Sequence, residues 1–205
     1  MEDYETEWRR KYRIELETPR FTLRPLQAGD EEWLTPIWAD PEVNRYLWEP
    51  DLTPRQAARG AEAMVRLDSY RHHFGVWAIQ EKTGGLIHGW VELCKLEPWW
   101  GPNDEIALSY VLARTSWGRG IATEASARLL RHAFDTDDYL ECVMAVVIGG
   151  HSASKRVLEK LGMRYVQSAS AVEGKDLEFF RLDAPTRSAE PRPDRPPTPA
   201  EPAAG

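Results

Sequence analysis

Cysteines, long apolar runs and clustered basic residues are scarce in this sequence. Among its 205 residues are two cysteines, Cys94 and Cys142, each in an apolar run without a neighbouring Cys or His at metal-ligand spacing. We therefore expect two buried, reduced thiols and no metal site. The charged residues 1–13 contain no apolar signal-peptide core, and no stretch approaches the roughly 18 apolar residues that span a bilayer. These absences predict a cytoplasmic protein with no membrane segment.

The charge balance argues against nucleic-acid binding. The formal net charge is −7, and Lys and Arg do not cluster as phosphate contacts require. An acidic protein suits a cationic acceptor better, although acidity also serves solubility alone. The 9 tryptophans are suited to filling a core or lining an organic-ligand site. We favour the core for most of them, because they sit inside apolar stretches.

Composition divides the chain into three parts. Residues 184–205 contain 7 of the 15 prolines and almost no large apolar side chain, so they cannot offset the entropy of ordering and are predicted to form a disordered tail. Residues 1–13 are a charged extension. Residues 14–183 have the length and patterning of one globular domain, and no internal repeat divides them.

Periodicity within residues 14–183 predicts a mixed α/β fold. The first half is expected to be antiparallel, with a strand from Ile14 to Leu26 bent or bulged at Thr18-Pro19, helices opening at Asp30 and Thr53-Pro54, hairpin strands 74–80 and 86–93, and a strand over 105–112. The second half is expected to contain helix 121–134, strand 141–148, helix 152–161 ended by Gly162, and strands 163–166 and 177–182.

The most informative segment joins the strand ending at Leu112 to the helix starting at Ile121. Gly118 and Gly120 let the backbone turn tightly there, and the first N–H groups of the helix stay available to a ligand. This arrangement suits a pyrophosphate, although glycines at such a turn also serve helix capping alone. The sequence has no P-loop, no G-x-G-x-x-G and no acid pair for magnesium. A nucleotide-type ligand held without metal points to coenzyme A.

Three stretches resemble the GNAT superfamily of N-acetyltransferases. Trp117-Gly118-Arg119-Gly120-Ile121-Ala122 is similar to its acetyl-CoA loop, Arg/Gln-x-x-Gly-x-Gly/Ala, with Trp117 at the first position. The continuation through Ala125, the opening stretch Leu16–Leu26 and the late helix His151–Met163 resemble the branch of ribosomal-protein N-terminal acetyltransferases of the RimJ and RimL type. The match extends over residues 14–182 in order and spacing.

The resemblance implies direct acetyl transfer from acetyl-CoA, without a metal, to a primary amine. The implied fold has a central, mixed, mostly antiparallel twisted sheet flanked by helices and splayed between its fourth and fifth strands. A homodimer is compatible with the resemblance. The residues implied to bind the cofactor are Tyr110, Val111, Leu112, Trp117, Gly118, Arg119, Gly120, Ile121, Ala122, Thr123, His151 and Ser154.

The sequence departs from the family near the reacting groups. His151 stands where the family usually has an Asn that contacts the pantetheine arm, and it can donate one hydrogen bond there with different reach. Leu158 occupies the place of the Tyr general acid of many members. In this branch Ser154 is at the position proposed to protonate the departing thiolate, but a helix-surface hydroxyl bonded to a preceding carbonyl is an equal interpretation.

The general base is less well specified. The branch often has Glu three residues before the strand Tyr, where this sequence has Ala107. Glu105, two residues earlier on the same strand face, is our first catalytic candidate, although a solvated carboxylate beside Asp104 is the simpler interpretation. Glu92 and His88 are the alternatives, and a single His on a strand is more often structural.

The acceptor site is expected between the two early helices and the hairpin loops. Glu49 and Asp51 could hold a cation there, and the acceptor is then a primary amine of a peptide N-terminus or a small molecule. Two other functions stay open, a non-catalytic acetyl-CoA-binding module and an interaction protein whose tail presents Pro193 and Pro196 at PxxP spacing. The aromatic side chains that could line the site are Trp38, Tyr46, Trp48, Trp77, Trp90, Trp99 and Trp100, of which Trp77 and Trp90 are better explained as core.

Overall fold

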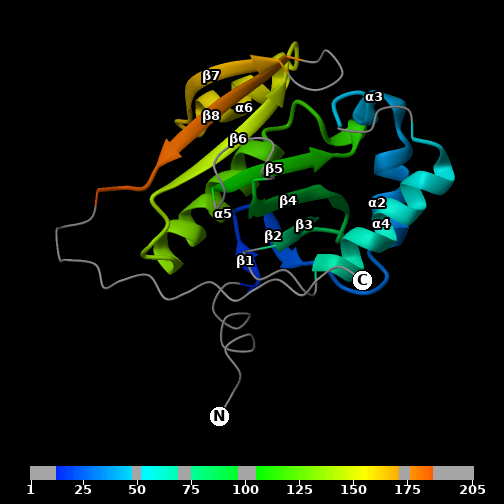
Figure 1. Cartoon of the computed structure of the whole chain (residues 1–205). Coiled ribbons are helices and arrows are strands. Elements are labelled where there is room, and N and C mark those ends of the chain that lie inside the picture. The colour runs from blue at the N-terminus through cyan, green and yellow to red at the C-terminus, as the bar shows by residue number, and fades with distance from the viewer. Residues whose placement is uncertain (1–12, 48–51, 69–74, 97–104, 171–175, 187–205) are drawn as a thin grey trace.

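The computed structural model describes residues 13–47, 52–68, 75–96, 105–170 and 176–186 (Figure 1). The strands are β1 (Leu16–Glu17), β2 (Phe21–Pro25), β3 (Gly75–Glu81), β4 (Ile87–Lys95), β5 (Ile106–Leu112), β6 (Cys142–Ile148), β7 (Arg164–Ser170) and β8 (Asp176–Asp183). The helices are α2 (Glu31–Ala39), α3 (Pro41–Asn44), α4 (Pro54–Asp68), α5 (Ile121–Thr136) and α6 (Ser152–Lys160), with a 3-10 turn η1 (Arg114–Ser116). None of the helices in these ranges has the length and hydropathy to cross a membrane. Most of the predicted N-terminal extension and tail lie outside the described residues.

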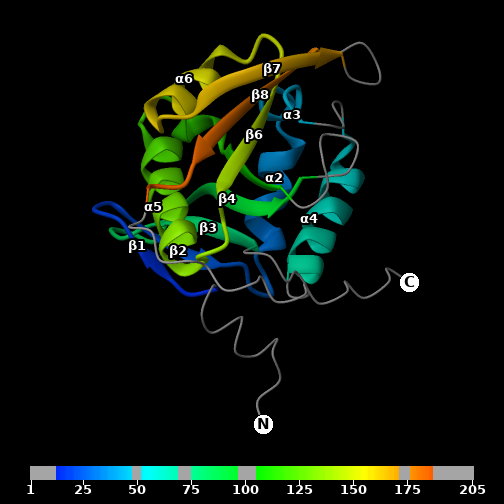
Figure 2. The same ribbon diagram turned by 60° about the vertical axis from the view of Figure 1, so that its left-hand side comes forward.

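All eight described strands form one sheet in the order β1-β2-β3-β4-β5-β6-β8-β7. Neighbouring strands are antiparallel except β5 and β6, which run parallel. Helix α5 packs on one face of the sheet, and α2 and α4 pack on the other (Figure 2). The mixed, mostly antiparallel sheet flanked by helices is thus confirmed.

Each face of the sheet has its own apolar core. The larger core packs the strands against α5 and contains Trp77, whose surface is 0% exposed. The smaller core packs α2 and α4 against the opposite face, around Trp90. Both tryptophans therefore fill the core, where the alternation of apolar residues along a strand places them on opposite faces.

The parallel strands β5 and β6 diverge toward their C-terminal ends. Along these two fully described strands, the register pairs are Ile106 with Val143 and Ala107 with Met144. By contrast, β4 and β5 pair along their length, from Gly89 and Leu112 to Lys95 and Ile106. The sheet therefore opens into a V beyond Ala107. The two strands are the fourth and fifth if the opening pair β1 and β2 is counted as one, so this is the splay that the resemblance implied.

The opening strand is not a single bent strand, as the sequence suggested, but a hairpin. Strand β1 runs antiparallel to β2, with Leu16 opposite Leu23. The Thr18 hydroxyl accepts the N–H of Phe21 at 2.8 Å and donates to the Phe21 carbonyl at 3.0 Å, which closes a turn at Pro19 and Arg20. Proline favours such a turn because its ring holds φ near about −65°.

The two cysteines also differ from expectation. The two do not form a disulfide with each other, as expected, but each is partly exposed rather than buried. Cys94 is the penultimate residue of β4 and Cys142 is the first residue of β6. Both therefore lie near strand ends, where the helices no longer cover the sheet completely.

Asp30 precedes α2 as predicted, but its side chain does not cap the helix. Its carboxylate accepts two hydrogen bonds from Arg24, one from the indole of Trp33 and one from the N–H of Gln27. Hydrogen bonds from an ionised guanidinium are stronger than those from a neutral amide. The Asp30 carboxylate therefore pairs with Arg24 of β2 instead of capping α2, and this ion pair anchors α2 to β2.

Candidate functional site

The loop between β5 and α5 follows the end of β5 that borders the V. Gly118 and Gly120 have φ of 73° and 74°, a left-handed conformation that residues with a Cβ rarely adopt. No atom lies within 4 Å of the place where a Cβ of Gly118 would stand, so the backbone there is open to a ligand. Gly120 precedes α5, and no side chain caps this helix. The N–H groups of its first turn, from Ile121 to Thr123, are available to an anion.

Two residues, Trp117 and Gly89, contact the end of β5 from which this loop starts. The indole Nε1 of Trp117 donates to the carbonyl oxygen of Leu112 at 3.0 Å. Gly89 lies opposite Leu112, and a Cβ on it would stand 2.1 Å from the carbonyl oxygen of Val111. Gly89 is therefore needed for β4 to approach this end of β5. A glycine inside an apolar strand is a known signal of close backbone approach, and Gly89 could have been found from the sequence by this signal.

A pair of hydroxyl groups spans the V from β5 to α6. The Oη of Tyr110 lies 2.9 Å from Oγ of Ser154 and donates to the Ser154 carbonyl oxygen at 3.2 Å. Burial raises the pKa of Tyr110 to about 12, although the hydrogen bond with Ser154 acts in the opposite direction. Tyr110 therefore keeps its proton near neutral pH, and the pair can deliver a proton to a group in the V. The sequence selected both residues but did not show that their side chains meet.

His151 precedes α6, directly after the end of β6 that borders the V. Its imidazole stacks on the ring of Tyr46, with ring centroids 3.7 Å apart and an angle of 17° between the planes. The Arg45 guanidinium lies 4.6 Å from the centroid of the same Tyr46 ring. Burial, and then the positive charge of Arg45, lower the pKa of His151. The imidazole is therefore neutral near pH 7 and can accept a proton.

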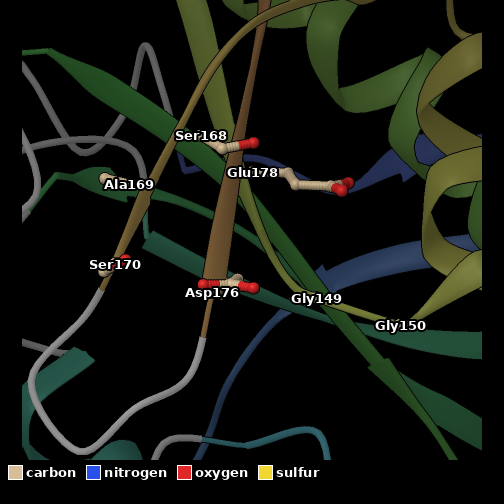
Figure 3. Close-up of a pocket in the computed structure, with 7 residues that line it drawn as sticks. All are labelled: Gly149, Gly150, Ser168, Ala169, Ser170, Asp176 and Glu178. Atoms are coloured by element: carbon tan, nitrogen blue, oxygen red, sulfur yellow. The ribbon is translucent and has the colours of Figure 1, made fainter.

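A pocket of about 380 Å³ opens beside the turn between β6 and α6 (Figure 3). The Glu178 carboxylate at its edge points toward α6, where its Oε1 accepts a hydrogen bond from Lys155 Nζ at 2.7 Å. Polar and small residues line this pocket: Gly149, Gly150, Ser168, Ala169, Ser170, Asp176 and Glu178. Lys155 balances the charge of Glu178, so Asp176 is the carboxylate that would attract a cationic or polar group to this pocket.

The structure does not bring Glu105, the first candidate base, to the hydroxyl pair. Glu105 immediately precedes β5, and its charge acts on Cys142 and Arg181 at the closed end of the β5–β6 pair. Tyr110 is five positions further along the strand, which corresponds to about 16 Å at roughly 3.3 Å per residue. A direct proton transfer from an amine in the V to Glu105 is therefore not supported.

The two alternative bases are buried. His88 is 0% exposed, its Nδ1 lies 2.8 Å from Oγ of Ser116, and burial lowers its pKa. Glu92 is also buried, on β4 opposite Ser109. The contact with Ser116 thus joins His88 to the last residue of the η1 turn. Neither His88 nor Glu92 is an exposed base.

Replacing Glu105 by glutamine tests its remaining claim to a catalytic role. Because Glu105 lies at the closed end of the strand pair, we expect kcat to stay within about twofold of the wild type and the pH dependence of kcat to keep its shape. The measurement is the steady-state rate over a pH series with one amine acceptor. A loss of more than about tenfold, with a changed pH profile, would restore Glu105 as the base.

Trp38 and Tyr46 are two of the aromatic residues that the sequence suggested for the acceptor site. Trp38 packs edge-on against Trp90, with ring centroids 5.8 Å apart, and belongs to the smaller core. Tyr46 lies at the His151 stack. The other residues suggested for the acceptor lie outside the described residues: Trp48, Glu49, Asp51, Trp99 and Trp100.

The residues around the V fit coenzyme A. The glycine loop and the uncapped start of α5 suit its diphosphate. Where β5 and β6 diverge, their backbone N–H and C=O groups can pair with the amides of a pantetheine arm. In the described ranges, no group of three or more side chains has the composition of a metal site.

Comparison with known proteins agrees with this fit. Residues 20–164 match a family model described as an acetyltransferase (GNAT) domain. The chain is 28% identical over 152 residues to the uncharacterized N-acetyltransferase p20 of Bacillus licheniformis, covering 73% of this chain and 82% of that protein.

Two solved structures share the fold. A GNAT-family acetyltransferase from Bacillus anthracis has a TM-score of 0.70 at 16% identity, covering 83% of this chain and 99% of that one. RimJ from Mycobacterium smegmatis, in complex with CoA-disulfide, has a TM-score of 0.67 at 18% identity, covering 85% and 89%. The family match extends over most of the chain and includes the glycine loop. The chain therefore belongs to the GNAT acetyltransferases and is an acyltransferase enzyme.

Proposed function

We propose that this enzyme transfers the acetyl group of acetyl-CoA directly to the primary amine at the N-terminus of a peptide or protein. The observation that carries the proposal is the hydroxyl pair of Tyr110 and Ser154, which spans the V next to an uncapped helix N-terminus. The resemblance of the loop and the late helix to enzymes of the RimJ and RimL type supports a peptide N-terminus as acceptor. A small-molecule amine is the second candidate, and the small polar pocket beside α6, with Asp176 in its lining, favours it.

Backbone groups would do most of the cofactor binding. The N–H groups of Gly118, Gly120, Ile121, Ala122 and Thr123 would hold the diphosphate, with positive charge from Arg119. The strand segment Tyr110, Val111 and Leu112 would pair with the pantetheine amides, and Trp117 would hold the loop against that strand. His151 would donate a hydrogen bond to the arm in place of the usual Asn.

The chemistry requires two proton movements. Acetyl-CoA supplies an activated acyl carbon, to which the amine nitrogen bonds while the carbon–sulfur bond breaks and its electron pair stays on sulfur. Ser154 Oγ, hydrogen-bonded to Tyr110 Oη at 2.9 Å, would protonate that sulfur and regain its proton through Tyr110 from water. The neutral imidazole of His151 would take the proton that the amine loses, directly or through water. His151 thus replaces Glu105 as the proposed base.

A non-catalytic acetyl-CoA-binding module is the competing function. Leu158, in place of the usual Tyr acid, is packed in the core with 1% of its surface exposed and cannot donate a proton. Ala107 likewise cannot act as a base. The hydroxyl pair argues for catalysis, because Ser154, one turn before Leu158 on α6, and Tyr110 of β5 offer an acid that Leu158 cannot supply.

Calorimetric titration of the full chain tests the common part of both functions. Acetyl-CoA and CoA are expected to bind with a Kd of about 1–100 μM, in line with typical enzyme affinities for substrate. Free thiol should then appear only when a peptide with a free N-terminus, or a small primary amine, is added. The same peptide with an acetylated N-terminus is the matched control. Binding without release by any amine would support the non-catalytic module, and no binding would contradict both.

The cellular location, the oligomeric state and the role of the Pro-rich tail are separate from the chemistry of the site. We propose a cytoplasmic location, because the two cysteines do not form a disulfide with each other, as in a reducing compartment. The homodimer and the dispensable Pro-rich tail stay predictions. Gel filtration of the full chain would check the homodimer, and the turnover of a chain ending at Asp183 would check the tail.

A further inference from the structure

We propose that Arg20, at the turn between β1 and β2, positions the diphosphate-binding loop and neutralises a carboxylate that would otherwise repel the cofactor. This inference rests on the proposed use of acetyl-CoA. Arg20 lies outside the glycine loop and about a hundred residues before it in the sequence. It was selected neither as a binding residue nor as a catalytic one.

Arg20 joins the hairpin turn to both sides of the α5 N-terminus. Its Nε donates to Oε2 of Glu124 at 2.7 Å, and its backbone N–H donates to Oε1 of the same carboxylate at 3.1 Å. Its NH1 group donates to the carbonyl oxygen of Arg119 at 3.1 Å. A single side chain therefore holds the peptide between the two loop glycines and the first turn of the helix.

The remaining guanidinium nitrogen faces the loop. A Cβ on Gly120 would stand 3.7 Å from NH2 of Arg20, so this nitrogen lies beside the residue that precedes α5. The guanidinium carbon lies 4.8 Å from the centroid of the Phe21 ring, an arrangement that orients the planar group. Arg20 thus places positive charge at the helix end where a diphosphate would lie.

Glu124 explains why this charge matters. It is the fourth residue of α5, close enough to the helix N-terminus to oppose an anion bound there. Partial burial works against its ionisation, but hydrogen bonds from Thr18 and Arg20 outweigh burial and lower the pKa of Glu124. The glutamate is therefore fully charged near neutral pH. Without Arg20, this negative charge would face the bound diphosphate uncompensated.

The other charges at this corner do not replace Arg20. Arg119 NH2 lies 3.8 Å from Glu81 Oε1, so part of its charge is balanced by that carboxylate. The Arg20 and Glu124 side chains are 44% and 21% exposed, and exposed ion pairs contribute little to folding stability. Arg20 should therefore affect ligand binding much more than unfolding.

The test compares ligands with and without a diphosphate. In Arg20→Gln, the Kd for CoA measured by calorimetry should rise about tenfold, while the melting temperature stays within about 2 °C. The kcat/KM for acetyl-CoA should fall by a similar factor, through KM. The kcat/KM for S-acetylpantetheine, which lacks the diphosphate, should stay within about twofold.

Two further variants separate positioning from general damage. Arg128→Gln removes another contact between α5 and the hairpin, the hydrogen bond from Nε to the Glu17 carbonyl oxygen at 3.1 Å, and should leave the Kd for CoA unchanged. Adding Glu124→Gln to Arg20→Gln should restore the Kd to within about threefold of the wild type, because it removes the uncompensated charge.

Three results would overturn the inference. These are an unchanged Kd for CoA in Arg20→Gln, an equal loss of kcat/KM with both donors, and no recovery of the Kd in the double variant. If the wild-type chain itself binds no CoA, the proposed function fails instead, so the two failures are distinguishable.

Discussion

Replacing Ser154 by alanine should lower kcat for amine acetylation about 100-fold while the Kd for CoA stays within about threefold. A positioned general acid contributes about 100- to 10,000-fold to a rate, and the Ser154 hydroxyl is the group of the pair carried by α6. Loss of the hydroxyl leaves the departing sulfur without a donor, although water can partly substitute. Steady-state kinetics with a saturating N-terminal peptide gives kcat, and calorimetry gives the Kd.

Tyr110→Phe should act through the same path. Its effect on kcat should be about 10- to 100-fold, and the double variant with Ser154→Ala should lose little more than the worse single variant, because groups that act as a unit are not additive. Tyr165→Phe is the matched control, since Tyr165 Oη also lies 2.8 Å from a serine hydroxyl, that of Ser168, but on the exposed strand β7. It should leave kcat unchanged.

The pH dependence adds a second check on the pair. Because burial raises the pKa of Tyr110 to about 12, the hydroxyl should remain protonated up to about pH 11. We therefore expect no decline of kcat from ionisation of Tyr110 between pH 7 and pH 10. A full kcat in Ser154→Ala, or equal losses in the Tyr165 control, would contradict the assignment of this pair as the acid.

Asp30→Asn should destabilise the protein by about 3–5 kcal/mol, the usual cost of breaking a buried ion pair by removing one partner. The Asp30 side chain is 4% exposed and accepts two hydrogen bonds from Arg24, at 2.7 and 2.8 Å. An amide has one oxygen and cannot accept from both guanidinium nitrogens of Arg24 and from the Trp33 indole. The Arg24 charge, 12% exposed, is then left without its counter-ion. Urea unfolding followed by tryptophan fluorescence measures the free energy of unfolding.

The effect of this substitution should depend on pH. Burial raises the pKa of Asp30, but hydrogen bonds from Arg24, Trp33 and Gln27 outweigh it, so the pKa lies below its ordinary 3.8. The stabilisation is therefore complete above the unfolded pKa near about 4 and is lost as pH falls through the lower folded value. Wild type and variant should converge in strong acid. Glu32→Gln, an exposed change in the first turn of α2, is the control and should cost less than about 0.5 kcal/mol.

Local patterns in the sequence predicted most of the elements well. Short apolar runs bounded by turn residues located β3, β4 and β5, and two glycines before an apolar helix located the turn that precedes α5. The hairpin of β1 and β2 was missed for a physical reason. A two-residue turn leaves the alternation of apolar residues almost intact on either side, so Thr18-Pro19 fits a bend as well as a reversal. The antiparallel pairing of Leu16 with Leu23 shows that the chain reverses direction there.

The side-chain geometry of the site was beyond reach of any local pattern. Tyr110 meets Ser154, Tyr46 meets His151, and each pair comes from segments that are distant in sequence. The resemblance placed Ser154 and His151 near the cofactor, but it contained no information on what each would touch in this chain. Periodicity did not show that Glu105 lies away from the hydroxyl pair, because the end at which β5 and β6 part is set by their long-range pairing, which the pattern along one strand does not report.

The position of β8 has a consequence for how the molecule assembles. It is the last strand in the chain, yet it lies between β6 and β7 and pairs with both along most of their length. Without it, β7 has no neighbour in this sheet and β6 keeps its two register pairs with β5. Helix α6, which carries Ser154, lies between β6 and β7 in the chain. The side of the V that carries α6 therefore forms only after synthesis has passed Asp183. The proposed acid and the proposed base thus reach their final positions last, by a non-local closure that is slow compared with hairpin formation in the first half.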